Sequence, residues 1–101
     1  GEASRAVDWM DRALKAGGTP QQRVRLFLDR AALQEKLRLR RDAFETRDRF
    51  LKEFPLHPLA LETLEGMRRD AETLSMTQEI PRLDREIERL KPPPGKAAPG
   101  R

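Results

Sequence analysis

Apolar side chains recur at helical spacing along most of this sequence, and prolines and glycines interrupt the recurrence. The clearest stripe lies in residues 42–54, where one helix face collects Ala43, Phe44, Phe50, Leu51 and Phe54. Pro55 disfavours a helical conformation in the residue before it, so this helix is predicted to end at Phe54. The same spacing predicts four further helices, over residues 2–16, 20–38, 58–74 and 78–91.

Residues typical of helix ends separate these segments. Gly17 and Gly18 stop the first helix, and Thr19 and Pro20 give the second an N-cap followed by proline at the first helical position. Pro58 can begin the fourth helix in the same way. The sequence contains no alternating run of β-branched residues, so no strand is expected. The predicted fold class is all-α, with about five helices in one domain over residues 1–90.

The second predicted helix carries apolar residues on two faces, which indicates neighbours on both sides. One stripe contains Val24, Phe27, Leu28 and Ala31, and the other contains Leu26, Leu33 and Leu37. Between the stripes runs a polar row of Arg23, Arg30 and Gln34, with Arg38 and Arg41 further along. This row can line a groove, or its side chains can be solvated while their stems cover apolar surface. Both interpretations stay open at this stage.

The composition of the chain excludes some kinds of site and leaves the compartment open. The chain has 38% charged residues and no cysteine, so it has neither disulfides nor thiolate ligands, and the compartment, cytoplasmic or periplasmic, stays open. No apolar run reaches the ~18 residues of a membrane-spanning helix, and we expect a soluble protein without membrane insertion.

Residues 1–57 are net basic and residues 58–90 net acidic, a pattern that salt-bridged helix surfaces commonly produce. Residues 91–101, KPPPGKAAPGR, have nothing apolar to bury and are predicted to be a disordered tail.

An internal repeat relates the predicted helices at an offset of 37 residues. The first helix aligns with the third through four pairs, Ala6 with Ala43, Met10 with Arg47, Ala13 with Phe50 and Leu14 with Leu51. The same offset carries Val24, Phe27 and Leu37 to Leu61, Leu64 and Leu74. The repeated unit is therefore a helical hairpin.

This repeat resembles the tetratricopeptide (TPR) family, in particular its bacterial members. In the family's helix B an alanine is followed by a large apolar residue, a small or apolar pair, and a proline at the turn. Here that pattern is matched by Ala6, Met10, Ala13 and Leu14, and again by Ala43, Phe50, Leu51 and Pro55. The resemblance implies a right-handed α-hairpin solenoid fragment that begins at a helix B whose helix A is missing.

Arg47 departs from the family pattern, because the family has an apolar residue at that position. We expect its side chain to pair with an acid or to extend its charged end to water. Two further departures are a period longer than the ~34 residues typical of the family and the absence of a tight glycine between the helices.

The resemblance implies a scaffold that binds a peptide or helix of a partner protein in a groove lined by the first helices of the hairpins. On this chain the lining would comprise Arg23, Phe27, Arg30, Gln34, Arg38 and Arg41. Such a basic groove suits an acidic peptide or a chain-terminal carboxylate, because the planar guanidinium binds carboxylates through two parallel hydrogen bonds.

Catalysis fits this sequence poorly. The one histidine, His57, lies in a proline-flanked turn, and no second histidine or carboxylate stands at metal-ligand spacing from it. We therefore expect neither an enzyme nor a cofactor.

Two other binding modes are alternatives to the scaffold. Basic residues over 23–41 and a pI of about 10.1 fit nucleic-acid binding, but Asp29, Glu35 and Asp42 interrupt them and no aromatic stacking platform accompanies them. The last helix spaces its apolar residues like two heptads, which suits either self-association or packing within the chain, through Ile80, Leu83, Ile87 and Leu90.

Overall fold

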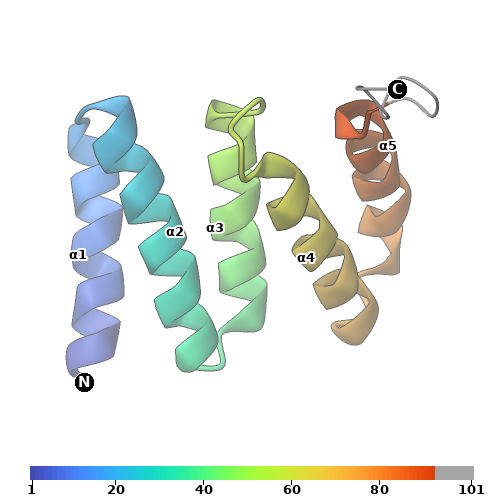
Figure 1. Ribbon diagram of the computed structural model, residues 1–101. Helices are drawn as coiled ribbons and strands as arrows, with labels where there is room; N and C mark the ends of the chain where they lie inside the picture. Colours follow the sequence, from blue (N-terminus) through green and yellow to red (C-terminus); the bar gives the residue numbers. More distant parts are fainter. Residues whose placement is uncertain (93–101) are drawn as a thin grey trace. The chain divides into compact units, whose positions relative to one another are not determined.

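The computed structural model describes residues 1–92, and this part of the chain consists of helices and turns without a strand. Its helices are α1 (Glu2–Ala16), α2 (Pro20–Lys36), α3 (Arg40–Glu53), α4 (Ala60–Thr73) and α5 (Ile80–Leu90), with a short 3-10 helix η1 (Thr77–Glu79) before the last (Figure 1). The all-α prediction is confirmed. Every predicted helix is present, with ends that differ from the prediction by no more than two residues. The predicted tail over residues 91–101 lies outside the described residues from residue 93 onward.

The start of α2 follows from its sequence. The Thr19 hydroxyl accepts a hydrogen bond from the Gln22 amide at 3.1 Å, and the Gln22 side chain accepts one from the Thr19 amide at 2.9 Å. This reciprocal capping box satisfies two amides that the first helical turn leaves without partners. Before it, Gly17 and Gly18 take φ angles of 109° and 118°, which side chains other than glycine rarely adopt. The chain therefore reverses sharply between α1 and α2.

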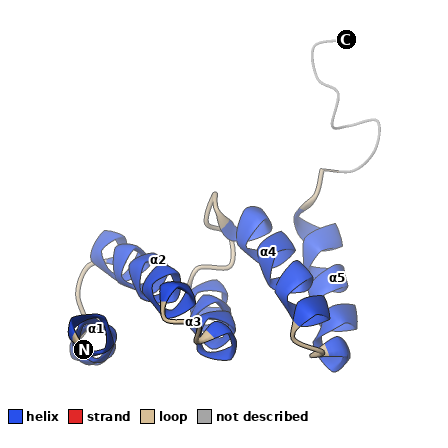
Figure 2. Ribbon diagram, turned by 90° about the horizontal axis from the view of Figure 1, so that it is seen from below, coloured by secondary structure: helices blue, strands red, loops and turns tan. Residues whose placement is uncertain are grey.

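The described part of the chain divides into two compact units, one up to Ala60 and one from Leu61 onward. In the first unit α2 lies between α1 and α3 and packs against both, as its two apolar faces predict (Figure 2). The centre of this packing takes one side chain from each helix, Leu14, Phe27 and Phe50. The rings of Phe27 and Phe50 lie 6.3 Å apart, within the range of favourable aromatic pairs.

The segment after α3 is held by the same aromatic cluster. His57 meets the Phe50 ring edge-on, at 5.4 Å between ring centres, and its Nδ1 accepts a hydrogen bond from the Leu59 amide at 3.0 Å. Both interactions fix the turn that follows α3. His57 therefore has a structural part in this turn.

Arg47 on α3 forms an ion pair between helices. Its guanidinium on α3 bonds the carboxylate of Glu35 on α2, and the Arg47 side chain is 21% exposed. The prediction that this arginine pairs with an acid is confirmed.

The second unit contains α4, η1 and α5. Arg68 on α4 donates to the Asp84 carboxylate on α5 at 2.6 Å. The apolar stripe of α5 that was a candidate for self-association has its central residues, Leu83 and Ile87, buried within the chain, while Ile80 and Leu90 are half-buried. Most of that stripe is therefore already covered.

The 37-residue period is present in the backbone as well as in the sequence. Helices α1, α3 and α5 end at Ala16, Glu53 and Leu90, each 37 residues after the one before. The turns after α2 and α4 are also 37 residues apart, and each places a residue other than glycine in the left-handed region, Arg38 at φ 64° and Ser75 at φ 58°.

Both turns have the hydrogen-bond pattern of a Schellman motif, in which the amide beyond the left-handed residue bonds back into the helix. The amide of Leu39 donates to the Gln34 carbonyl and that of Met76 to the Ala71 carbonyl, each at 2.8 Å. The two hairpins therefore share one turn geometry, built without the glycine that usually occupies it.

Candidate functional site

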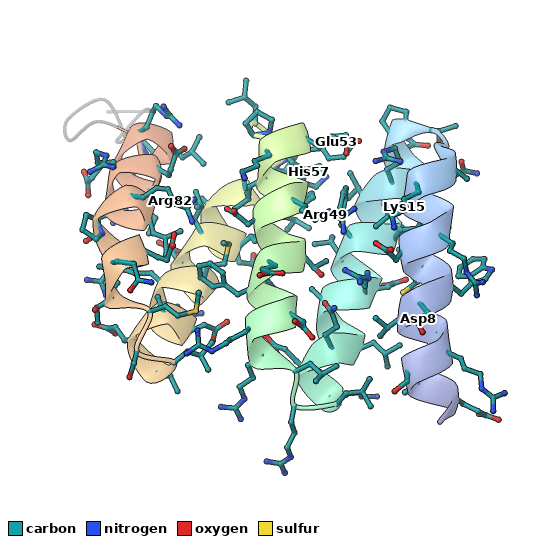
Figure 3. All side chains as sticks on the ribbon, turned by 180° about the vertical axis from the view of Figure 1, so that it is seen from behind. Asp8, Lys15, Arg49, Glu53, His57 and Arg82 are labelled. Carbon is teal, nitrogen blue, oxygen red and sulfur yellow. The ribbon has the colours of Figure 1, made fainter. Side chains whose placement is uncertain are left out.

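A groove of about 380 Å³ opens in the first unit, with α2 as its floor and α1 and α3 as its walls. Its lining includes Val7 and Asp8 from α1, Arg30 and Gln34 from α2, and Asp42, Glu45, Thr46 and Arg49 from α3. Figure 3 looks onto this face, with Asp8 and Lys15 on α1 and Arg49 and Glu53 on α3. Because α2 packs between α1 and α3, two residues of its polar row, Arg30 and Gln34, face the groove.

Three polar side chains, Arg30, Gln34 and Thr46, form a hydrogen-bonded chain on the floor of the groove, and we call them the polar trio. The Arg30 guanidinium donates from Nη1 to the Thr46 hydroxyl at 2.8 Å, and that hydroxyl donates to Gln34 Oε1 at 2.6 Å. Arg30 also donates from Nε to the Val7 carbonyl of α1 at 3.3 Å. The trio thus links all three helices. Gln34 and Thr46 are buried, and Arg30 is 15% exposed.

Positive charge gathers where two arginines that line the groove, Arg30 and Arg49, approach Asp11 on α1. Asp11 on α1 lies 3.1 Å from Lys15 Nζ, 3.3 Å from Arg49 Nη1 and 3.9 Å from Arg30 Nη2. Hydrogen bonds from Lys15 and then Arg49 lower the pKa of Asp11 below its ordinary value. One carboxylate therefore faces three cations, and we call this cluster of Asp11, Lys15, Arg30 and Arg49 the cationic end of the groove.

Arg23 on α2 hydrogen-bonds to both α1 and α3. Its guanidinium binds both carboxylate oxygens of Glu53, with Nη2 to Oε1 at 2.9 Å, and donates from Nη1 to the Leu14 carbonyl at 2.6 Å. The hydrogen bonds from Arg23 lower the pKa of Glu53. Arg23 thus ties the last turn of α1 to the end of α3, where a cation is favoured by the exposed carbonyls of a helix.

Acidic side chains mark the end of the groove nearest the turn between α2 and α3. Asp8, Asp42 and Glu45 line it and are exposed. The groove therefore carries positive charge toward Lys15 and Arg49 and negative charge toward the turn. A ligand of mixed charge would be oriented by this difference.

The six residues predicted to line a binding groove occupy different environments. Arg30 and Gln34 line the groove, while Phe27 is buried beneath it with the guanidinium groups of Arg23 and Arg49 over its ring, at 5.8 and 5.6 Å from the ring centre. Arg38 and Arg41 lie in and just after the α2–α3 turn and are exposed. Of the six predicted residues, the structure thus places Arg30 and Gln34 in the groove, Arg23 over the buried Phe27 ring, and Arg38 and Arg41 at the turn.

Sequence reasoning missed Thr46, Asp11, Lys15 and Arg49. Thr46 offered one signal, because it is a polar residue on the apolar face of its helix, 37 residues before the leucine at position 83. The spacing of Asp11 and Lys15 predicts an ion pair along α1, but nothing local connects this pair to Arg49 on a helix 38 residues away.

A second hollow lies beside α1 and α2 and is mostly apolar. Its lining includes Trp9, Ala13 and Leu26, over about 530 Å³. Trp9 is 59% exposed, the most of any aromatic side chain in the described part of the chain.

The described residues limit two other classes of site. Within residues 1–92 no three His, Asp or Glu side chains are arranged to hold a metal ion. Among the helices of that region, none combines the length and the apolar character that crossing a membrane requires.

Comparison of this chain with protein-family models, with curated proteins and with solved structures finds no match.

Proposed function

We propose that this chain is a protein-interaction scaffold that holds a segment of a partner protein in the groove between α1, α2 and α3. The observation that carries the proposal is the cationic end, where Lys15, Arg30 and Arg49 surround the single carboxylate of Asp11. Arg49 also interacts with Glu53, which Arg23 binds, so four cations stand against two carboxylates and a surplus of positive charge remains. An acidic side chain or a chain-terminal carboxylate of the partner would neutralise it through charge-assisted hydrogen bonds.

The acidic end sets a direction for the bound segment. Asp42 and Glu45 on α3 and Asp8 on α1 favour a basic residue of the partner close to the α2–α3 turn. A peptide with its acidic group at the cationic end and a basic residue here would match both charges, whereas the reversed orientation would place like charges together. The preferred partner is therefore a segment of mixed charge rather than a uniformly acidic one.

We propose that the scaffold consists of TPR-like helical hairpins, and the repeat supports this assignment. The turns after α2 and α4 share one geometry and lie 37 residues apart. The ends of α1, α3 and α5 are also spaced 37 residues apart. Repeats of this kind stack into right-handed solenoids whose surfaces bind other proteins. The proposal for this chain is the same arrangement and the same use.

Nucleic-acid binding is the second candidate. It is favoured by Lys36, Arg38 and Arg40, which are exposed around the α2–α3 turn. Against it, Arg23, Arg25 and Arg47 pair with carboxylates of this chain, so part of the basic stretch is already neutralised.

A peptide panel tests the scaffold proposal. Synthetic peptides of about ten residues, each with one acidic and one basic residue at varied spacing, would be titrated with the full chain by fluorescence anisotropy. Each peptide would be made in a glutamate and a glutamine form. We expect the full chain to bind members of the panel and Arg49→Glu to weaken binding at least about tenfold, which corresponds to ~1.4 kcal/mol.

The matched control is Arg85→Glu, which makes the same charge change at an exposed position of α5 in the second unit. It should leave the affinity unchanged. A panel that does not bind at all, or binding that Arg49→Glu and Arg85→Glu affect equally, would overturn the proposal that the groove is the binding site.

A further inference from the structure

The polar trio occupies positions that are apolar in the other hairpin. Advancing Arg30, Gln34 and Thr46 by the repeat offset of 37 residues leads to Met67, Ala71 and Leu83. All three of these side chains are fully buried, at 0% exposure. The second hairpin thus has buried apolar side chains at the three positions where the first has a hydrogen-bonded polar chain.

Comparing the two hairpins shows whether the polar trio is required for the hairpin to fold. A buried amide and a buried hydroxyl are unfavourable unless both are hydrogen-bonded, and apolar side chains of suitable volume fill the same space without that requirement. Because the second hairpin folds with such side chains, the polar trio is not a requirement of this architecture. In the described part of the chain every buried side-chain nitrogen or oxygen has a partner, so the trio is a complete network rather than a packing defect.

The hydrogen bonds of the trio hold the Arg30 guanidinium in one orientation. Nε donates to the Val7 carbonyl and Nη1 to the Thr46 hydroxyl, so the fork is fixed on two sides. Nη2 lies 3.9 Å from Asp11, which is beyond hydrogen-bond distance. The guanidinium has five N–H donors. Nη2 makes no hydrogen bond within the described residues. Arg30 and Arg49 both line the groove and both approach Asp11, so a ligand oxygen in the groove can accept from Nη2.

We infer that Thr46 and Gln34 are positioning residues that hold the Arg30 guanidinium for a carboxylate of the partner. The inference rests on the proposed function and adds to it the group that is recognised and the residues that orient its receptor. The Thr46 hydroxyl donates to Gln34 Oε1, which leaves its lone pairs for Arg30. An arginine that is already oriented loses little conformational freedom when a carboxylate binds.

The second hairpin supplies the substitutions that test the inference. The swap variant carries Arg30→Met, Gln34→Ala and Thr46→Leu, which are the residues of the second hairpin at these positions. Thr46→Val removes only the hydroxyl, and Thr46→Ser keeps it. Each variant of the full chain would be melted by circular dichroism and titrated with the paired glutamate and glutamine peptides described above.

The expected result is a separation of stability from recognition. The swap variant melts cooperatively, close to the unsubstituted chain, and binds the glutamate and glutamine forms equally, with the Kd for the glutamate form raised at least about tenfold. Thr46→Val loses part of the preference for the glutamate form, whereas Thr46→Ser, which keeps the hydroxyl, retains the preference. This rescue would not be expected of a residue that only fills space.

Two results would overturn the inference. One is a swap variant that no longer folds, because the trio would then be needed by the hairpin itself. The other is a Thr46→Val variant that keeps the full preference for the glutamate form. In both cases the unsubstituted chain still binds the panel and the proposed function stands, whereas an unsubstituted chain that binds no peptide removes both the proposed function and the inference.

Discussion

Arg30 on α2 donates a hydrogen bond to Thr46 on α3 at 2.8 Å, and Thr46 is itself fully buried between the helices. The Thr46 hydroxyl serves both Arg30 and Gln34. A single hydroxyl therefore decides whether two further polar groups are satisfied. Removing it should have a different effect from removing the whole network.

We expect Thr46→Val to lower the free energy of unfolding by about 1–3 kcal/mol, because Gln34 and Arg30 lose a partner in a buried position. The swap to Met, Ala and Leu at positions 30, 34 and 46 should be less destabilising than Thr46→Val, since it leaves no polar group unpaired. Urea unfolding followed by circular dichroism measures both. A swap variant less stable than Thr46→Val would contradict this expectation.

The turn after α2 gives an independent prediction. Arg38 has a φ of 64°, a conformation that is unfavourable for residues with a Cβ atom and accessible to glycine. Arg38→Gly should therefore raise the free energy of unfolding by about 0.5–1 kcal/mol, the relief of strain being partly offset by the freedom of glycine in the unfolded chain. The control is Arg38→Ala, which removes the same side chain and keeps the strain. Equal stability of the glycine and alanine variants would show that the left-handed conformation is not strained here.

The aromatic centre of the first unit is expected to carry much of its stability. Phe50 is fully buried and contacts the rings of Phe27, Phe54 and His57. Phe50→Ala should lower the free energy of unfolding by about 3–5 kcal/mol, because it leaves a large cavity. Leu56→Ala is the matched control, since this leucine is 84% exposed and its truncation should change stability by less than about 0.5 kcal/mol. Thermal and urea unfolding report both, and similar losses in the two variants would argue against Phe50 as the centre of the core.

Much of the fold could be predicted because its signals are local. Gly17, Gly18 and Pro20 mark the boundary between the first two helices within a few residues, and Phe50 lies on a clear apolar stripe. The groove is different in kind. The cationic end joins Asp11 to Arg49 across 38 residues of sequence, and no periodicity indicates which acid a given arginine will meet. Arg23 is an example: the sequence predicts that it binds a partner, whereas in the structure it forms an ion pair with Glu53 of the same chain.

Acid should weaken the first unit through two carboxylates whose pKa values are lowered. Asp11 and Glu53 have ordinary pKa values of 3.8 and 4.5, and hydrogen bonds from Lys15 and Arg23 respectively lower them in the folded chain. A lowered pKa stabilises the fold above the unfolded value, and this contribution is lost as the pH falls through the folded value. The melting temperature should thus decrease as the pH falls from about 5 to about 3. Asp11→Asn with Glu53→Gln should flatten this decrease, and a variant with an unchanged pH profile would exclude these two groups as its cause.

Salt dependence separates the two candidate functions. Binding of nucleic acid to Lys36, Arg38 and Arg40 would release counterions and weaken steeply between about 50 and 200 mM salt. Binding of a peptide in the groove involves a few partly buried charges and should weaken much less over that range of salt.

Replacing the three turn residues together by glutamate should abolish any nucleic-acid binding and leave peptide affinity unchanged, while Arg49→Glu should have the opposite effect. Peptide and single-stranded DNA titrations of both variants, each at two salt concentrations, give four comparisons. If the turn variant lost peptide affinity and Arg49→Glu did not, the binding surface would have to be placed at the α2–α3 turn instead of the groove.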